Sequence, residues 1–428
     1  MTVQFTSGVP EEGATAGSHA GEAQIRDFYN AFPYPWKAWV AERPIDPDLY
    51  RIHLCQDVGD WSHRRIPASP SIWVAGCGTN QAVLTALRFP TAQTLGSDLS
   101  DTALRLESEQ ATALDVKLEF EKVNINDASY VEEFDYVLCT GVVHHNPDPR
   151  LTLRKLCSAL RPGGILELMV YNQFHRVATS ALQEALRLLV GTAAQRDWAV
   201  EAMLAKRLLH HFPVDNLLTR TLAPYRFGQE EEFIDATINP LERSFTVSSL
   251  AALAEAAGLQ LILPCPNSFD LQDERYLWHL DFGDIDLQSC FDRLSDLERW
   301  QVVNLLRFDM APMLWFYLER RDCNRRRTQE EVNNGFLATR FTRSDASAMR
   351  FVRDLTDERY TKLPDPVPLP SGQGDAEVRR VTAEADGAKE MRDLLLSLGF
   401  ELKPALVNKL RIQLTSSLFP RLRAVAEP

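Results

Sequence analysis

Short apolar runs alternate with segments of helical periodicity between residues 66 and 172. Runs of this length with few polar residues inside them are typical of strands that are buried on both faces of a sheet. The runs that predict strands are residues 71–75, 94–97, 118–123, 134–139 and 165–170. Segments of helical pattern follow Asn80 and Ser100 and cover residues 150–160. This alternation predicts an α/β fold with a doubly wound, Rossmann-like parallel sheet.

The pattern changes beyond residue 172. Residues 176–227 show helical periodicity, so we expect a helical insert at 176–245 that acts as a substrate cap. The later elements that the pattern predicts are helices at 246–258, 378–398 and 404–418 and strands at 259–263 and 313–318. We expect residues 323–428 to form a mostly helical C-terminal appendage, which serves either dimerisation or substrate docking.

The N-terminal part carries no sheet pattern. Residues 1–20 are small and polar and are expected to be disordered. Residues 21–65 carry a dense aromatic cluster, for which two interpretations are open: a lid over a bound ligand, or a flap packed on the sheet edge. The core is then expected to span residues 66–175 and to be completed by residues 246–322.

Charge and composition restrict the partners of the chain. The 428 residues hold 46 basic and 59 acidic side chains, a net charge of −13, whereas nucleic-acid-binding domains usually present a basic surface. We therefore expect no nucleic-acid substrate. No apolar run approaches the roughly 18 residues of a membrane span, and no signal peptide is predicted. The seven cysteines form no C-x-x-C pair, so we expect a reduced, cytoplasmic protein without a metal site.

The candidate chemistry concentrates in the stretch S-I-W-V-A-G-C-G-T-N-Q at residues 71–81. Gly76 and Gly78 interrupt a buried strand just before a helix; the first allows a tight turn and the second a close approach of the backbone to a ligand. Asp98 follows about 20 residues later, where an acid can bind ribose hydroxyls. A dinucleotide fingerprint requires a third small residue where this chain has Gln81. The turn therefore favours S-adenosylmethionine, which has no pyrophosphate, over a dinucleotide.

Several stretches together resemble the class I S-adenosylmethionine-dependent methyltransferases. In chain order they are V-A-G-C-G-T-N-Q at 74–81, G-S-D-L-S at 96–100, F-D-Y-V-L-C-T-G-V-V-H-H-N-P-D-P at 134–149, L-R-P-G-G-I-L-E-L at 160–168, F-T-V-S-S-L at 245–250 and A-G-L at 257–259. F-Y-N-A-F-P-Y-P-W at 28–36 resembles a segment that precedes the fold in one bacterial subgroup. The ordered set is more specific than the glycine turn alone, although Asn80 stands where the family usually has glycine. The resemblance covers about residues 25–320 and implies a seven-stranded sheet.

The resemblance also implies which residues hold the cofactor. They are Gly76, Cys77, Gly78, Thr79, Asn80 and Gln81 in the turn, Asp98 and Leu99 at the ribose, Asn124 and Ile125 at the adenine, and Thr140, Gly141 and Val142 after the fourth strand. Asn124 could pair with adenine through both its donor and its acceptor, or could be an ordinary polar residue at a strand end. From the lid, Tyr29 and Tyr34 are the expected contacts, because aromatic faces attract a cation such as the sulfonium of the methyl donor.

Two adjacent histidines, His144 and His145, follow the fourth predicted strand. One of them is a candidate general base, because an unperturbed histidine can accept a proton at neutral pH. The other interpretation, which we favour, is a structural donor that fixes the loop against Asp148. His175 is a second candidate base.

The acceptor pocket is expected to include Tyr171, Asn172 and Asn239. The implied function is methyl transfer from S-adenosyl-L-methionine to a small molecule or a peptide, and oxygen methylation in specialised metabolism is preferred because it is frequent in the family. The tail is compatible with a homodimer. The main alternative is a non-catalytic, methyltransferase-like binding or assembly protein, and a nicotinamide oxidoreductase is a weaker third interpretation.

Overall fold

The computed structural model describes residues 15–425 except 36–37, 191–196, 213, 224–229, 273–274, 277, 279, 324, 326, 355, 357–358 and 371–373. Residues 1–14 of the N-terminus that we expected to be disordered, and Trp36 of the aromatic cluster, lie outside the described residues. The expectation of disorder is wrong for residues 15–20, because the helix α1 (Thr15–Ala31) begins at Thr15. The alanines of this stretch favour a helix once the following turns are packed.

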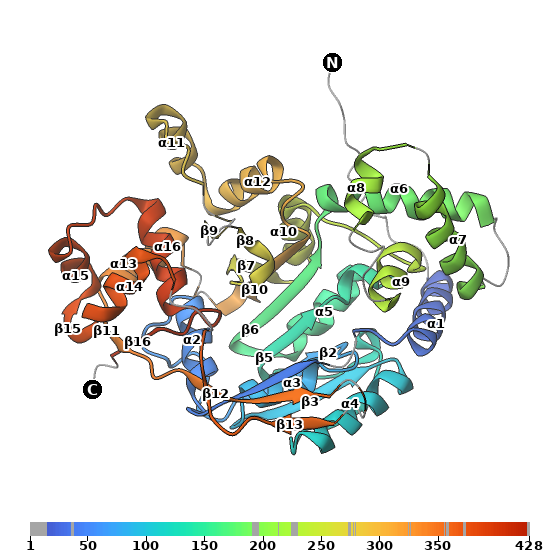
Figure 1. Ribbon diagram of the computed structural model, residues 1–428, viewed down its shortest axis with the longest axis horizontal. Coiled ribbons are helices and arrows are strands. Elements are labelled where there is room, and N and C mark those ends of the chain that lie inside the picture. The colour runs from blue at the N-terminus through green and yellow to red at the C-terminus, as the bar shows by residue number, and fades with distance from the viewer. Residues whose placement is uncertain are drawn as a thin grey trace.

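A seven-stranded sheet forms the centre of the molecule, which confirms the predicted α/β architecture (Figure 1). In sheet order the strands are β4 (Glu119–Lys122), β3 (Gln93–Asp98), β2 (Ser71–Ala75), β5 (Phe134–Thr140), β6 (Leu160–Tyr171), β10 (Met313–Arg320) and β7 (Leu259–Pro264). The first five are parallel, whereas β10 runs antiparallel to both of its neighbours. Each predicted strand of the sheet is therefore present, and the ends differ from the predicted ones at every strand except β2.

The middle strands are apolar on both faces because helices cover the sheet. Ile72, Trp73 and Val74 of β2 are fully buried, and the Trp73 ring stacks on Phe134 at a centroid distance of 5.7 Å. The helices that pack around this core are α3 (Gln81–Arg88), α4 (Asp101–Ala113), α5 (Pro149–Ala159), α10 (Val247–Ala256) and α12 (Asp296–Leu306).

The order of the strands reverses between β2 and β5. From β2 the chain adds β3 and β4 toward one edge, and it then returns to add β5 and β6 toward the other. Connections on the two sides of such a reversal lead away from each other, which leaves a crevice at the carboxyl ends of the strands. The topology therefore places a ligand site beyond β2 and β5.

The helical insert packs on the N-terminal helix. Its helices are α6 (Gln173–Val190), α7 (Trp198–His211), α8 (Leu217–Leu222) and α9 (Glu230–Ile238). Phe28 of α1 is fully buried in one cluster with Leu182 and Phe233, and its ring centroid lies 5.3 Å from that of Trp198. In Figure 1 these helices lie together with α1 on one side of the molecule. The aromatic N-terminal segment and the insert thus share a hydrophobic core.

The C-terminal part combines helices with two small sheets. Its elements are α13 (Gln329–Leu337), β11 (Arg340–Arg343), β12 (Ser347–Arg353), β13 (Tyr360–Lys362), β14 (Val367–Pro368), α14 (Ala376–Glu384), β15 (Asp386–Glu390), α15 (Met391–Ser397), α16 (Pro404–Thr415) and β16 (Leu422–Ala424). β12 pairs antiparallel with β1 (Val40–Pro44), and α16 packs on α2 (Leu49–Asp57). The short elements β8 (Leu271–Gln272), β9 (Arg275–Tyr276) and α11 (Ile285–Asp292) complete the fold.

The single helix predicted at 378–398 is wrong. α14 ends at Glu384, and β15 pairs with β11 before α15 begins at Met391. Gly387 has a φ of +83°, which lies in the left-handed region that a continuous helix excludes. The Asp-Gly pair inside the helical pattern was the local signal of this break.

A buried ion pair holds the segment after α2 against the antiparallel end of the sheet. Arg65 donates from Nη2 to Oε2 of Glu319 on β10 at 2.6 Å, and the two side chains are only 6% and 0% exposed. Gln260 of β7 donates to the other carboxylate oxygen at 3.0 Å. The guanidinium thus compensates a carboxylate that has no access to water.

Replacement of this arginine tests the contribution of the pair. We expect Arg65→Ala to lower the free energy of unfolding by about 3–5 kcal/mol, because the Glu319 carboxylate would remain buried without a cation. Arg105→Ala is the matched control, since Arg105 and Glu109 form an exposed pair that is worth about 0.2–1 kcal/mol. Urea unfolding measures both variants, and equal losses would contradict this account.

Candidate functional site

A cavity of about 830 Å³ opens at the carboxyl ends of β2, β3, β5 and β6. Its volume is within the range of about 300–1,000 Å³ that is typical of small-molecule sites. The predicted residues that line it are Tyr29, Tyr34, Gly76, Cys77, Gly78, Asn80, Gln81, Asp98, Leu99, Asn124, Ile125, Thr140, Gly141, Val142, His145, Tyr171 and His175. Thr79, His144, Asn172 and Asn239 do not line it.

The turn after β2 needs glycine at two positions for steric reasons. Gly76 and Gly78 have φ angles of +73° and +59°, which side chains rarely adopt. A Cβ atom on Gly76 would overlap the Val142 side chain, and one on Gly78 would lie 2.6 Å from the carbonyl oxygen of Tyr34. Asn80, in contrast, is the N-cap of α3 with a φ of −154°, so the glycine usual in the family is not required there.

Asp98 lies at the end of β3, beside this turn. Its Oδ2 accepts from the Gly78 amide at 2.9 Å, and its Oδ1 accepts from the Ser100 amide at 2.8 Å. Burial raises the pKa of Asp98 above its ordinary value, and the amide donors oppose this shift. The carboxylate thus supports the turn and borders the cavity, where its remaining lone pairs suit the hydroxyls of a ribose.

The turn is also held from outside the cavity. The hydroxyl of Thr79, which we expected to contact the cofactor, instead donates to the carbonyl oxygen of Pro35 in the aromatic segment. Glu107 of α4, which sequence reasoning missed, accepts from the amides of Ala82 and Val83 at 2.6 and 3.1 Å and so caps α3. Burial raises the pKa of Glu107 to about 8. A glutamate in the middle of an amphipathic helix gives no sequence signal of such a role.

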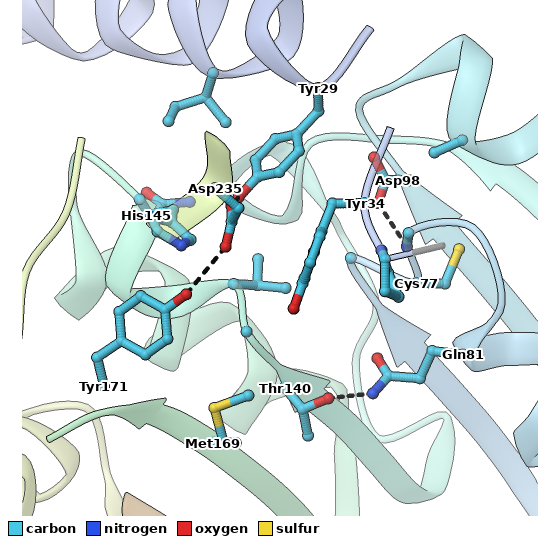
Figure 2. Close-up of a pocket in the computed structure, with 18 of the residues that line it drawn as sticks. Tyr29, Tyr34, Cys77, Gln81, Asp98, Thr140, His145, Met169, Tyr171 and Asp235 are labelled. Atoms are coloured by element: carbon cyan, nitrogen blue, oxygen red, sulfur yellow. Dashed lines mark hydrogen bonds between the residues drawn. The ribbon is translucent and has the colours of Figure 1, made fainter. Parts of the chain in front are cut away.

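The other side of the cavity holds a cluster of hydrogen-bonded polar groups around Asp235 of α9 (Figure 2). Tyr29 of α1 donates to Oδ1 of Asp235 at 2.9 Å, and Tyr171 at the end of β6 donates to Oδ2 at 3.0 Å. Burial and the nearby Asp235 raise the pKa of both tyrosines well above the ordinary value, so their hydroxyls stay protonated. Figure 2 shows the Tyr34 ring between this cluster and the side of Asp98 and Cys77.

Asn239 supports this cluster from behind. Its amide donates to the Tyr29 hydroxyl at 3.0 Å and to Oδ1 of Asp235 at 3.1 Å, while its side chain is fully buried. The sequence singled out Asn239 as an acceptor contact and missed Asp235, four residues earlier on the same helix-to-loop segment. The amide therefore orients Asp235 and Tyr29 instead of facing the cavity.

Asn172 was expected in the acceptor pocket, and this prediction is wrong. Its amide donates to the carbonyl oxygen of Ala311 at 2.7 Å, and its side-chain oxygen accepts from Asn304 of α12 at 3.0 Å. Successive side chains of a strand point to opposite faces, so Asn172 lies on the face opposite to Tyr171. His175, in the first turn of α6, does line the cavity, and burial lowers its pKa.

The two adjacent histidines differ in their surroundings. His144 is fully buried, neither ring nitrogen has a hydrogen-bond partner among the described residues, and its ring lies 3.9 Å from that of Tyr171. Burial lowers the pKa of His144 well below its ordinary value, so it packs as a neutral ring. The expected pairing with Asp148 is wrong, because the Asp148 carboxylate accepts from the Leu151 amide at 2.9 Å and caps α5.

His145 lines the cavity beside the Asp235 cluster. Its Nδ1 lies 2.8 Å from the carbonyl oxygen of Leu241, and its ring centroid lies 5.4 Å from that of Tyr171. A carbonyl oxygen can only accept, so Nδ1 carries a hydrogen and Nε2 is the ring nitrogen that is left to accept a proton. Of the adjacent pair, His145 is thus the one placed to accept a proton in the cavity.

No group of three or more histidine, cysteine, aspartate or glutamate side chains in the described ranges is arranged to hold a metal ion. In the same part of the chain, none of the helices combines the length and the apolar composition that crossing a bilayer requires.

Comparison with known proteins identifies a family model that matches part of the chain. The family model described as "Methyltransferase domain" matches residues 73–166, from β2 into β6. An uncharacterized protein of Synechococcus is 30% identical over 294 residues, which are 66% of this chain and 68% of that protein. The ubiquinone biosynthesis O-methyltransferase of Xanthomonas axonopodis is 28% identical over 187 residues, which cover 42% of this chain and 75% of the relative.

A solved structure resembles most of the fold. PKMT2 from Rickettsia typhi, determined in complex with AdoHcy, superimposes with a TM-score of 0.59 over 89% of this chain and 76% of its own, at 14% identity. A shorter match is the tRNA U34 carboxymethyltransferase of Campylobacter jejuni, 32% identical over 95 residues, which are 22% of this chain and 32% of that protein.

Substitution of the second glycine of the turn tests the cofactor side. We expect Gly78→Ala to abolish binding of S-adenosylhomocysteine, because the new Cβ would meet the Tyr34 carbonyl oxygen at 2.6 Å and displace either the turn or the aromatic segment. Gly399→Ala is the control: Gly399 has a φ of +78° but no atom within 4 Å of its Cβ position, so this variant bears the backbone strain alone, about 1–2 kcal/mol. Calorimetric titration measures both, and equal affinities would contradict the steric argument.

Proposed function

We propose that this chain, whose residues 73–166 match the family model of the methyltransferase domain, transfers a methyl group from S-adenosylmethionine to a hydroxyl of a small molecule or a peptide. The observation that carries this proposal is a single cavity that joins the glycine turn and Asp98 on one side to a proton acceptor, His145, on the other. A cavity of this size accommodates a cofactor together with a small acceptor group.

The residues on the β2 and β3 side fit the cofactor. A side chain does not fit at Gly76 or Gly78, and the glycines leave the backbone of the turn accessible. Asp98 offers carboxylate oxygens for ribose hydroxyls. Tyr34 contributes an aromatic ring to the same cavity. When bound, S-adenosylmethionine supplies a methyl group that its positive sulfur has already activated for displacement.

The chain's own contribution to the chemistry is then positioning and proton removal. Fixing two reacting groups in line can supply several orders of magnitude in rate. A hydroxyl must also lose its proton as its oxygen attacks, and Nε2 of His145 is the acceptor that the geometry offers, since Nδ1 is committed to the Leu241 carbonyl. The Xanthomonas relative, an O-methyltransferase by name, supports an oxygen acceptor.

The first experiment asks whether and where the methyl group is transferred. Purified protein is incubated with S-adenosylmethionine carrying a tritiated methyl group and with fractionated bacterial extract. We expect label in the small-molecule or peptide fraction. Label that disappears on nuclease treatment would contradict the proposed acceptor class, as the net charge of −13 also argues against nucleic acid. Cofactor binding without any transfer would favour the non-catalytic alternative.

The second experiment tests the proton acceptor. We expect His145→Gln to lower kcat by about 10²–10⁴-fold, since general base catalysis typically contributes this much. Binding of S-adenosylhomocysteine should be preserved, because the turn and Asp98 are untouched. His210→Gln, an exposed histidine of α7, is the control and should leave kcat unchanged. Normal turnover of the His145→Gln enzyme would contradict this role and would indicate that His145 is structural.

A further inference from the structure

The side of the cavity where we place the methyl acceptor, around His145, contains a carboxylate. No cation among the described residues neutralises this carboxylate. Asp235 is only 4% exposed, and its described hydrogen bonds come from the neutral donors Tyr29, Tyr171 and Asn239. A carboxylate has about four acceptor positions. Tyr29 and Asn239 donate to the two acceptor positions of Oδ1, and Tyr171 donates to one of the two positions of Oδ2. Oδ2 therefore retains one acceptor position at the cavity.

The two arginines of the cavity lining, Arg26 and Arg176, are both paired with carboxylates of their own, Arg26 with Asp27 at 3.0 Å. Arg176 of α6 lies over the Tyr171 ring at 4.3 Å, but its guanidinium makes two hydrogen bonds to the carboxylate of Glu242, at 2.7 and 2.5 Å. Both side chains of that pair are almost fully buried, at 6% and 3% exposure. Arg176 and Glu242 therefore cancel each other, and Asp235 leaves this side of the cavity negative.

The rings around Asp235 add to the attraction for a cation. Tyr29 and Tyr171 both contact the carboxylate, and the His145 ring lies 6.3 and 5.4 Å from their respective centroids. Aromatic faces attract cations most strongly where water is excluded. A buried carboxylate with a free acceptor position, bordered by aromatic rings, is suited to an ammonium group on an apolar body.

We propose that the methyl acceptor is a hydroxylated amine, whose positively charged nitrogen binds Oδ2 of Asp235 while its hydroxyl lies toward Nε2 of His145. The proposal rests on the methyltransferase function proposed above and adds the charge of the substrate to it. Asp235 acts here as a specificity-determining residue, because a neutral or anionic acceptor would leave its carboxylate uncompensated.

A matched pair of ligands tests this recognition directly. Tyramine and 4-ethylphenol share the phenol and the two-carbon chain and differ in the ammonium group. Protein saturated with S-adenosylhomocysteine is titrated with each in a calorimeter. We expect tyramine to bind at least about 10-fold more tightly, as a charge-assisted hydrogen bond would provide. Equal binding of the two ligands, or no measurable binding of tyramine, would overturn the proposal.

Three variants assign the preference to Asp235. Asp235→Asn should reduce it to less than about twofold, because the amide keeps the shape but loses the charge. Asp57→Asn, which alters another buried carboxylate that accepts from a tyrosine, should leave it unchanged. Tyr171→Phe keeps the Asp235 charge and removes one donor, so the preference should persist even if Asp235→Asn does not fold.

Two results separate this inference from its premise. If Asp235 serves the cofactor's sulfonium instead of the acceptor, Asp235→Asn will weaken the binding of S-adenosylmethionine more than that of S-adenosylhomocysteine, whose sulfur carries no charge, and this result would overturn the proposal. If the wild-type protein binds neither of these molecules, the proposed function itself fails. If the protein binds S-adenosylmethionine and S-adenosylhomocysteine normally but shows no preference for tyramine, only the proposal that the acceptor is a hydroxylated amine is rejected.

Discussion

The two tyrosine hydrogen bonds to Asp235 bring together parts of the chain that are remote in sequence. Tyr29 belongs to α1, Tyr171 ends β6, and Asp235 belongs to α9, so the N-terminal helix, the sheet and the insert meet at one carboxylate. Leaving either buried hydroxyl without its acceptor would cost about 1–3 kcal/mol. The Asp235 side of the cavity and the position of the N-terminal helix therefore depend on the same contacts.

The cofactor side of the site could be predicted because its determinants are local. A buried strand, two glycines and an acid at the next strand end are all encoded within residues 71–98, and the structure places the two glycines and the acid at the cavity. Thr79 is the exception. Whether a turn residue points inward depends on backbone angles that the sequence does not specify, and its actual partner, Pro35, is 44 residues away.

The Asp235 side of the cavity was less predictable because it is built from long-range contacts. Asp235 follows three glutamates in a helical segment and resembles an ordinary surface acid, although it is almost fully buried. One error was avoidable. Met169 and Tyr171 both line the cavity, and the period of two along a strand then assigns Asn172 to the other face. The strands of the C-terminal part were missed for a related reason, since β12 finds its partner β1 about 300 residues earlier in the chain.

The aromatic segment around Tyr34 is held on both sides, and this arrangement links the C-terminal part to the cavity. Before it, Tyr29 is bound to Asp235; after it, β1 pairs with β12 from Val40↔Val352 to Pro44↔Ala348. The C-terminal part is in turn fixed by buried polar contacts, because Asp57 of α2 accepts both from Ser417 at 2.6 Å and from Tyr317 of β10 at 3.0 Å. Buried polar contacts of this kind must be satisfied together, and they therefore specify one docking geometry more strictly than apolar packing would. Tyr34 is thus set over the glycine turn by contacts that reach both the insert and the far end of the chain.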